Sequence, residues 1–216
     1  MSTVVEKVTA FITRDVTQGS DAARELLIFA HPSAGTQVPA GTVEPGERIE
    51  AAVLRETAEE AGLQAVTIVA HLATQTTDLA PGQAIVTSTT PLYSAPALDA
   101  PTGELILHRG WPIAISGAPT DGWSPVTYVE DDLNSSPPRQ LLHCDGWIPA
   151  GCAGTRVTRH LFHLALTAPT PDHWEHLAEG RHRFAFSWTP LTPRPHLVAA
   201  QDAWLAAVYE QLRRMP

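Results

Sequence analysis

The sequence predicts an α/β fold for a single domain of 216 residues that carries a β-rich insertion. Three observations support this prediction. Short runs of apolar and β-branched residues recur near both ends of the chain, separated by turn residues. A helix pattern lies between residues 47 and 61, and an amphipathic pattern ends the chain at residues 196–213. The middle, residues 76–154, is rich in Pro, Gly, Thr and Ser and yet contains apolar runs.

The first elements are predicted to be strands. Residues 4–13 and 25–30 are rich in β-branched and apolar side chains, and residues 15–22 between them have a turn composition with Gly19. Residues 37–43 predict a further short strand that Pro39 and Gly41 interrupt.

The helix that follows carries its own start and stop signals. Glu47 and Glu50 are expected in its first turn, where negative charge suits the helix dipole, and Gly62 is expected just after its last turn. Its small side chains suggest a packing stripe, with the glutamates on the flank away from it. The stripe consists of Ala51, Leu54, Ala58 and Gly62.

The remaining strands are predicted from short apolar runs. They cover residues 66–73, 84–87, 104–108, 126–129, 158–166 and 184–189. Three of these runs fall inside residues 76–154, so this segment is expected to be an irregular, folded insertion and not a linker.

Composition restricts the classes of function. A net charge of −9 argues against nucleic acid as a partner, because phosphate binding depends on Lys and Arg. No run of about 18 apolar residues suggests a membrane span, and no secretory segment opens the chain, so a cytoplasmic protein is expected. Cys144 and Cys152 form neither a disulfide framework nor a zinc pattern.

A cluster of carboxylates on the first helix is the strongest chemical signal. Glu56, Glu59 and Glu60 lie at i, i+3 and i+4, so they are neighbours on the helix surface. Two such charges about 4 Å apart repel by about 4 kcal/mol at the effective dielectric of a protein surface. A hard divalent cation, Mg²⁺ or Mn²⁺, would relieve this repulsion. Arg55, four residues before Glu59, is expected to orient a glutamate.

The spacing of these residues resembles the signature of the Nudix hydrolase family. Gly41 is followed after five residues by Glu47, after seven more by Arg55-Glu56, and then by Glu59-Glu60 and Gly62-Leu63. A chance match of seven positions at about 7% each is on the order of one in a hundred million. Thr57 stands where the family usually has an aliphatic residue, and Ala40 where a second glycine is common. The resemblance implies an α/β/α sandwich with a mixed β-sheet.

The resemblance also implies roles for these residues. Glu56, Glu59 and Glu60 would bind the metal, and Gly41, Glu47 and Gly62 would support the site, with the Gly41 carbonyl or its neighbour as a further ligand. Arg55, Glu59 and Glu60 are the predicted catalytic residues, and Glu59 is the first choice for the general base. Other candidates for the base come from later segments: Glu104, Asp121, Glu130, Asp131, Asp132, Glu175 and Glu179.

The activity implied is hydrolysis of a phosphoanhydride in a nucleoside diphosphate linked to another moiety, of nucleotide-sugar, ADP-ribose or dinucleotide type. The substrate is therefore a small nucleotide derivative. The alternative is a Nudix-fold sensor or interaction module without turnover. The insertion could place a tryptophan (Trp111, Trp123 or Trp147) on a base or an arginine (Arg109 or Arg139) on a phosphate, or it could cap the site or form a homodimer contact.

Overall fold

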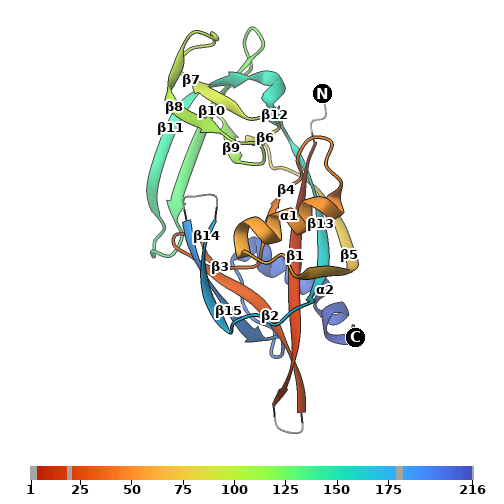
Figure 1. Cartoon of the computed structure of the whole chain (residues 1–216). Coiled ribbons are helices and arrows are strands. Elements are labelled where there is room, and N and C mark those ends of the chain that lie inside the picture. Colours follow the sequence, from red (N-terminus) through yellow and green to blue (C-terminus); the bar gives the residue numbers. More distant parts are fainter. Residues whose placement is uncertain (1–3, 19–20, 179–181, 216) are drawn as a thin grey trace. The chain divides into compact units, whose positions relative to one another are not determined.

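The structure is a computed structural model that describes residues 4–18, 21–178 and 182–215. The chain divides into two compact units (Figure 1). The strand unit comprises Met1–Lys7 and Gln75–Arg159, and the two-helix unit comprises Val8–Thr74 and His160–Pro216. The predicted turn at Gly19 lies outside the described residues.

The two-helix unit is built on an eight-stranded sheet. In spatial order its main strands are β14 (His173–Ala178), β15 (His182–Pro190), β2 (Asp21–His31), β1 (Val4–Gln18), β13 (Arg156–Leu166) and β5 (Val66–Asp78). Two short strands complete it, β3 (Gly35–Gln37) on β2 and β4 (Ala40–Thr42) on β1. The antiparallel ladder from β2 to β15 sets Phe29 opposite Phe186.

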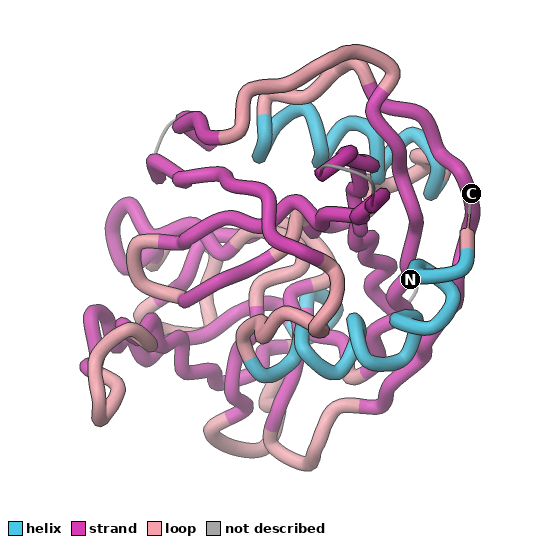
Figure 2. The backbone as a smooth tube through the Cα atoms, turned by 90° about the horizontal axis from the view of Figure 1, so that it is seen from below, coloured by secondary structure: helices cyan, strands magenta, loops and turns pink. Residues whose placement is uncertain are grey.

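The helices α1 (Ile49–Ala61) and α2 (Ala199–Arg214) lie on opposite faces of this sheet, as Figure 2 shows. Alternate residues of β1 point to opposite faces of the sheet. Val8, Ala10 and Ile12 belong to the core cluster beneath α1, whereas Phe11 belongs to the cluster beneath α2. The unit is therefore an α/β/α sandwich, which confirms the predicted fold class.

Helix α1 begins later than predicted. It starts at Ile49, so Glu50 is the acidic residue of its first turn and Glu47 lies in the preceding loop. Its end agrees with the prediction, because Gly62 adopts φ 70° and donates its N–H to the Ala58 carbonyl at 3.0 Å. A left-handed residue at this position favours glycine.

The predicted packing stripe of α1 is wrong. The buried residues are Ala52, Val53, Thr57 and Ala61, whereas Ala51 and Gly62 are exposed and Leu54 is 36% exposed. At 100° per residue the buried arc also contains Glu56 and Glu60. A hydrophobicity pattern does not identify this arc as the buried side, because it contains polar residues. The buried Thr57 is tolerated because its hydroxyl donates to the Val53 carbonyl at 2.8 Å.

Helix α2 is close to its prediction, with its inner side formed by Gln201, Leu205, Val208 and Leu212. Leu197 is buried but precedes the helix. Among the described residues, no helix is long and apolar enough to cross a membrane.

The strand unit has a seven-stranded sheet with its own core. The strands are, in spatial order, β12 (Ala153–Gly154), β6 (Gln83–Val86), β9 (Pro112–Ile115), β10 (Trp123–Asp132), β11 (Arg139–Pro149), β7 (Thr90–Tyr93) and β8 (Pro101–Leu107). A 3-10 turn, Ala150–Cys152, precedes β12. The sequence predicted β6, β8 and β10. It missed β7, β9, β11 and β12 of this sheet, and also β14 of the two-helix unit. Both β7 and β9 contain proline, which is uncommon inside strands.

The core of the strand unit comes from several of these strands. It includes Ala84, Val86, Leu92, Leu107, Ile113, Val126, Tyr128 and Ile148. The segment predicted as irregular is thus a regular antiparallel sheet, with Cys144 and Cys152 as free thiols.

Candidate active site

Helix α1 lies against strand β4 through two of its glutamates. The Thr42 N–H donates to Glu56 Oε1 at 3.0 Å, and the Ala40 N–H donates to Glu60 Oε2 at 2.9 Å. Four residues of a helix span about 6 Å along its axis, and two residues of a strand span about 6.6 Å. Two side chains four residues apart on the helix can therefore reach two backbone amides that lie two residues apart on the strand. The two carboxylates therefore flank Gly41.

Gly41 is required by the closeness of this contact. A Cβ atom on Gly41 would lie 1.8 Å from Glu56 Cδ and 2.1 Å from its Oε2. These distances are far inside van der Waals contact, so a side chain at this position would displace the Glu56 carboxylate. The glycine of the signature thus has a steric reason in this chain.

Arg55 ties the helix to the loop before it. Its Nε and Nη2 donate to the two oxygens of Glu47 at 2.9 and 3.0 Å, and Nη2 also donates to the Thr42 carbonyl at 3.0 Å. Glu47 additionally accepts the Glu44 N–H at 2.9 Å. The guanidinium hydrogen bonds lower the pKa of the Glu47 carboxyl. Glu47 is therefore a half-buried anchor for the loop, although it lies outside the helix.

The same arginine contacts two further glutamates. Its Nη1 donates to Glu56 Oε1 at 3.0 Å and to Glu59 Oε2 at 2.8 Å. The Glu56 side chain is 12% exposed and that of Glu59 is 52% exposed. Burial raises the pKa of Glu56, an effect that the Arg55 guanidinium opposes. One guanidinium thus faces three carboxylates, which leaves an excess of negative charge.

This excess charge and the hard oxygen donors suit a divalent cation. The present side-chain positions serve other partners, since Glu59 binds Arg55 and Glu60 binds the Ala40 amide. Within the described part of the chain, no three His, Cys, Asp or Glu side chains are grouped so that they could hold a metal ion. The residues therefore fit Mg²⁺ or Mn²⁺ by chemistry and charge, and joint ligation requires Glu59 and Glu60 to turn from these partners.

The candidates for the general base are separated by the fold. Glu104, Asp121 and the Glu130–Asp131–Asp132 run lie in the strand unit. Glu175 lies on β14 and is exposed. Glu179 lies outside the described residues. Within the described part of the two-helix unit, the carboxylates that contact Arg55 belong to the signature residues Glu47, Glu56 and Glu59.

The tryptophans considered for base stacking already have aromatic neighbours. Trp111 stacks on Tyr128 at 5.2 Å between ring centroids, and Trp123 meets Tyr93 edge-on at 5.0 Å. Trp147 pairs with Tyr93 across β11 and β7. A contact between these rings and a nucleotide base stays a prediction.

The two arginines considered for phosphate binding also have partners within the strand unit. Arg109 donates to the Thr87 carbonyl, and Arg139 lies 3.8 Å from Asp132. A phosphate contact for either arginine stays a prediction.

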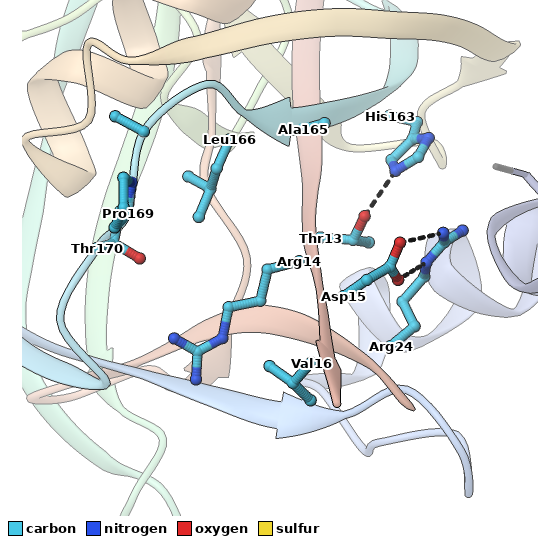
Figure 3. Close-up of a pocket in the computed structure, with 11 residues that line it drawn as sticks. Thr13, Arg14, Asp15, Val16, Arg24, His163, Ala165, Leu166, Pro169 and Thr170 are labelled. Atoms are coloured by element: carbon cyan, nitrogen blue, oxygen red, sulfur yellow. Dashed lines mark hydrogen bonds and ion pairs between the residues drawn. The ribbon is translucent and has the colours of Figure 1, made fainter. Parts of the chain in front are cut away.

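A cavity of about 460 Å³ lies elsewhere in the two-helix unit (Figure 3). The Nε2 atom of His163 lies 2.8 Å from the Thr13 hydroxyl, and Arg24 pairs with Asp15 at 2.7 Å. Burial lowers the pKa of His163 to about 4, so its imidazole is neutral at pH 7. None of the predicted site residues lines this cavity.

Comparison with known proteins decides the family. The family model of the NUDIX domain matches residues 8–123, which include the whole of α1 and β4. The chain belongs to the NUDIX family. This confirms the resemblance that the signature indicated.

The chain was also compared with solved structures and with curated proteins. A comparison with solved structures finds the crystal structure of C. elegans Ap4A hydrolase, at 15% sequence identity and a TM-score of 0.42, over 97% of this chain and 98% of that chain. No curated protein matches the chain. As a NUDIX member the protein is a hydrolase that cleaves pyrophosphate bonds in nucleoside diphosphate derivatives.

Proposed function

We propose that this NUDIX enzyme requires Mg²⁺ or Mn²⁺ and cleaves the phosphoanhydride of a nucleoside diphosphate linked to a second moiety, of nucleotide-sugar, ADP-ribose or dinucleotide type. One observation carries the proposal, namely that Arg55 contacts Glu47, Glu56 and Glu59 together. We further propose that the 216 residues act as a single NUDIX domain in which residues 76–154, which form most of the strand unit, are an insertion.

The metal would be held by Glu56, Glu59 and Glu60, with the carbonyl of Gly41 or its neighbour as a further ligand. When bound, the ion neutralises phosphate oxygens and polarises the phosphorus that water attacks. Glu56 is the most buried of the contacting carboxylates and is fixed by the Thr42 amide, so it supplies the rigid part of the site.

The general base in this proposal is Glu59. Its Oε2 accepts from Arg55 Nη1 in this structure; once Glu59 has turned toward the metal, one carboxylate oxygen would bind the ion and the other would accept the proton of the attacking water. Its side chain is 52% exposed, so water reaches it. Arg55 holds this glutamate, and Glu47 holds Arg55 by a bidentate pair.

The test is a substrate panel with Mg²⁺ or Mn²⁺, containing ADP-ribose, nucleotide sugars and diadenosine polyphosphates. The variants are Glu59→Gln and Glu60→Gln, each expected to lose at least about a hundredfold in kcat. Glu50→Gln is the matched control, because Glu50 lies in the first turn of the same helix and its side chain is 47% exposed. We expect it to retain wild-type activity.

Two outcomes would remove the proposal: no cleavage of any anhydride, or equal activity in all three variants. Calorimetric binding of the uncleaved nucleotides without turnover would favour the alternative of a sensing module.

A further inference from the structure

Strand β14 presents alternate side chains to the end of helix α1. Trp174 and His176 are half-buried and Ala178 is buried, whereas the residues between them are exposed. Because side chains alternate along a strand, Trp174 and His176 point to the same face, the one beneath α1.

Both side chains donate hydrogen bonds to the last turn of the helix. Trp174 Nε1 donates to the Ala61 carbonyl at 2.9 Å, and His176 Nε2 lies 3.1 Å from the Glu59 carbonyl. A carbonyl only accepts, so this contact places the proton of His176 on Nε2. The last four carbonyls of a helix have no partner within the helix, and β14 supplies partners for two of them.

Trp174 and His176 pack tightly where they contact the end of α1. A Cβ atom on Gly62 would lie 2.8 Å from His176 Nδ1, so the imidazole packs directly against the glycine backbone. The Trp174 ring stacks on Phe186, with 5.1 Å between the centroids and 11° between the planes. Phe186 belongs to the buried core cluster of the unit, and β14 is paired along its length with β15. The donors are therefore carried by the sheet itself.

We propose that Trp174 and His176 are positioning residues for the hydrolytic reaction. Their targets, the carbonyls of Glu59 and Ala61, lie on either side of Glu60 in the chain. By fixing the position of this turn, they fix the positions from which Glu60 contacts the Ala40 amide of β4 and Glu59 contacts Arg55. Helix ends fray when their carbonyls lose partners, and the carboxylates of this turn would then lose their positions. The inference rests on the proposed function.

The test removes each donor and keeps the ring. Trp174→Phe and His176→Phe delete the N–H groups, and His176→Gln restores a donor. Trp188→Phe is the matched control, because Trp188 lies in the same core cluster and its Nε1 donates to the Pro171 carbonyl at 3.2 Å, away from α1. Four measurements are compared: thermal unfolding, hydrogen exchange of the peptide covering residues 56–63, Mn²⁺ affinity without substrate, and kcat with KM.

For the two donor deletions we expect faster exchange at residues 56–63, Mn²⁺ binding weakened by about tenfold, and kcat lowered by about tenfold with KM little changed. Small displacements of catalytic groups are known to reduce rates by this much or more. His176→Gln should recover most of the loss. Trp188→Phe should lower the unfolding temperature as much as the others while leaving exchange at residues 56–63, Mn²⁺ affinity and kcat unchanged.

Unchanged exchange in both donor deletions would overturn the proposed tether. Faster exchange with unchanged kcat and Mn²⁺ affinity would overturn the positioning role and leave a structural contact. If the wild-type enzyme cleaves none of the substrates, the proposed function fails. The exchange and Mn²⁺ measurements then still show whether Trp174 and His176 hold the carboxylates of this turn in place, because neither measurement requires turnover.

Discussion

Replacing Gly41 by alanine should destabilise the protein through one identifiable clash. The added Cβ would lie 1.8 Å from Glu56 Cδ, whereas ordinary contact between such atoms is about 3.5–4.0 Å. The carboxylate must therefore move by about 2 Å, which breaks its 3.0 Å hydrogen bonds with the Thr42 amide and with Arg55.

The magnitude follows from these losses. A buried donor left without a partner costs about 1–3 kcal/mol, and overpacking adds about 1–3 kcal/mol. We expect a loss of about 3 kcal/mol, or about 6–12 °C in Tm for a chain of this size. Mn²⁺ affinity and kcat should fall as well, because Glu56 is a proposed metal ligand.

The assay is a double-mutant cycle by thermal and urea unfolding. Glu56→Ala removes the group with which the new methyl collides, so Gly41→Ala should cost much less in that background, with a coupling energy of about 1–3 kcal/mol. Gly151→Ala is the control, since a Cβ at Gly151 would meet no atom within 4 Å. An equal cost of Gly41→Ala with and without the Glu56 side chain would refute the steric reasoning.

Three further predictions concern other positions. Burial lowers the pKa of His163 to about 4, whereas in the unfolded chain its pKa is about 6.5. Between these two pH values the unfolded chain binds a proton at His163 that the folded chain does not bind. The free energy of unfolding should therefore drop by about 2 kcal/mol from pH 7.5 to 5. Urea unfolding at both pH values should show this drop removed in His163→Gln; the same pH slope in both proteins would contradict it. Gln201 accepts the Val38 N–H at 2.7 Å and is buried, so Gln201→Leu should cost about 1–3 kcal/mol by urea unfolding, against almost nothing for the exposed Gln211→Leu. Arg55→Lys should lower kcat by at least about tenfold in steady-state assays, because lysine cannot form the bidentate pair; wild-type kcat would refute this.

The family and the glutamate cluster were predictable from local sequence. Spacing along one helix places Glu56, Glu59 and Glu60 side by side whatever the rest of the chain does, since a helix has a fixed periodicity. The stop at Gly62 was predictable for a similar reason, because a left-handed residue after a helix favours glycine.

The packing face of α1 was not predictable from hydrophobicity. Ala51, Leu54 and Gly62 of the predicted stripe are exposed, whereas the buried arc holds two glutamates and a threonine beside Ala52, Val53 and Ala61. Those glutamates lie against the sheet because β4 offers them amide donors at Ala40 and Thr42. A hydrophobicity scale treats glutamate as a surface residue, so it cannot predict that these hydrogen bonds offset the cost of burying the two carboxylates.

The sequence by itself determined the order of most elements in the two-helix unit, the family, and which residue types carry the chemistry. All of these depend on periodicity and spacing within short segments. Only the tertiary structure decided that Arg55 joins the loop glutamate to the helix, that Gly41 makes room for Glu56, and that β14 holds the end of α1 through Trp174 and His176. Trp174 contacts Ala61 although more than a hundred residues separate them in the sequence. Such a contact depends on how the sheet brings distant segments together, and a local sequence pattern does not contain this information.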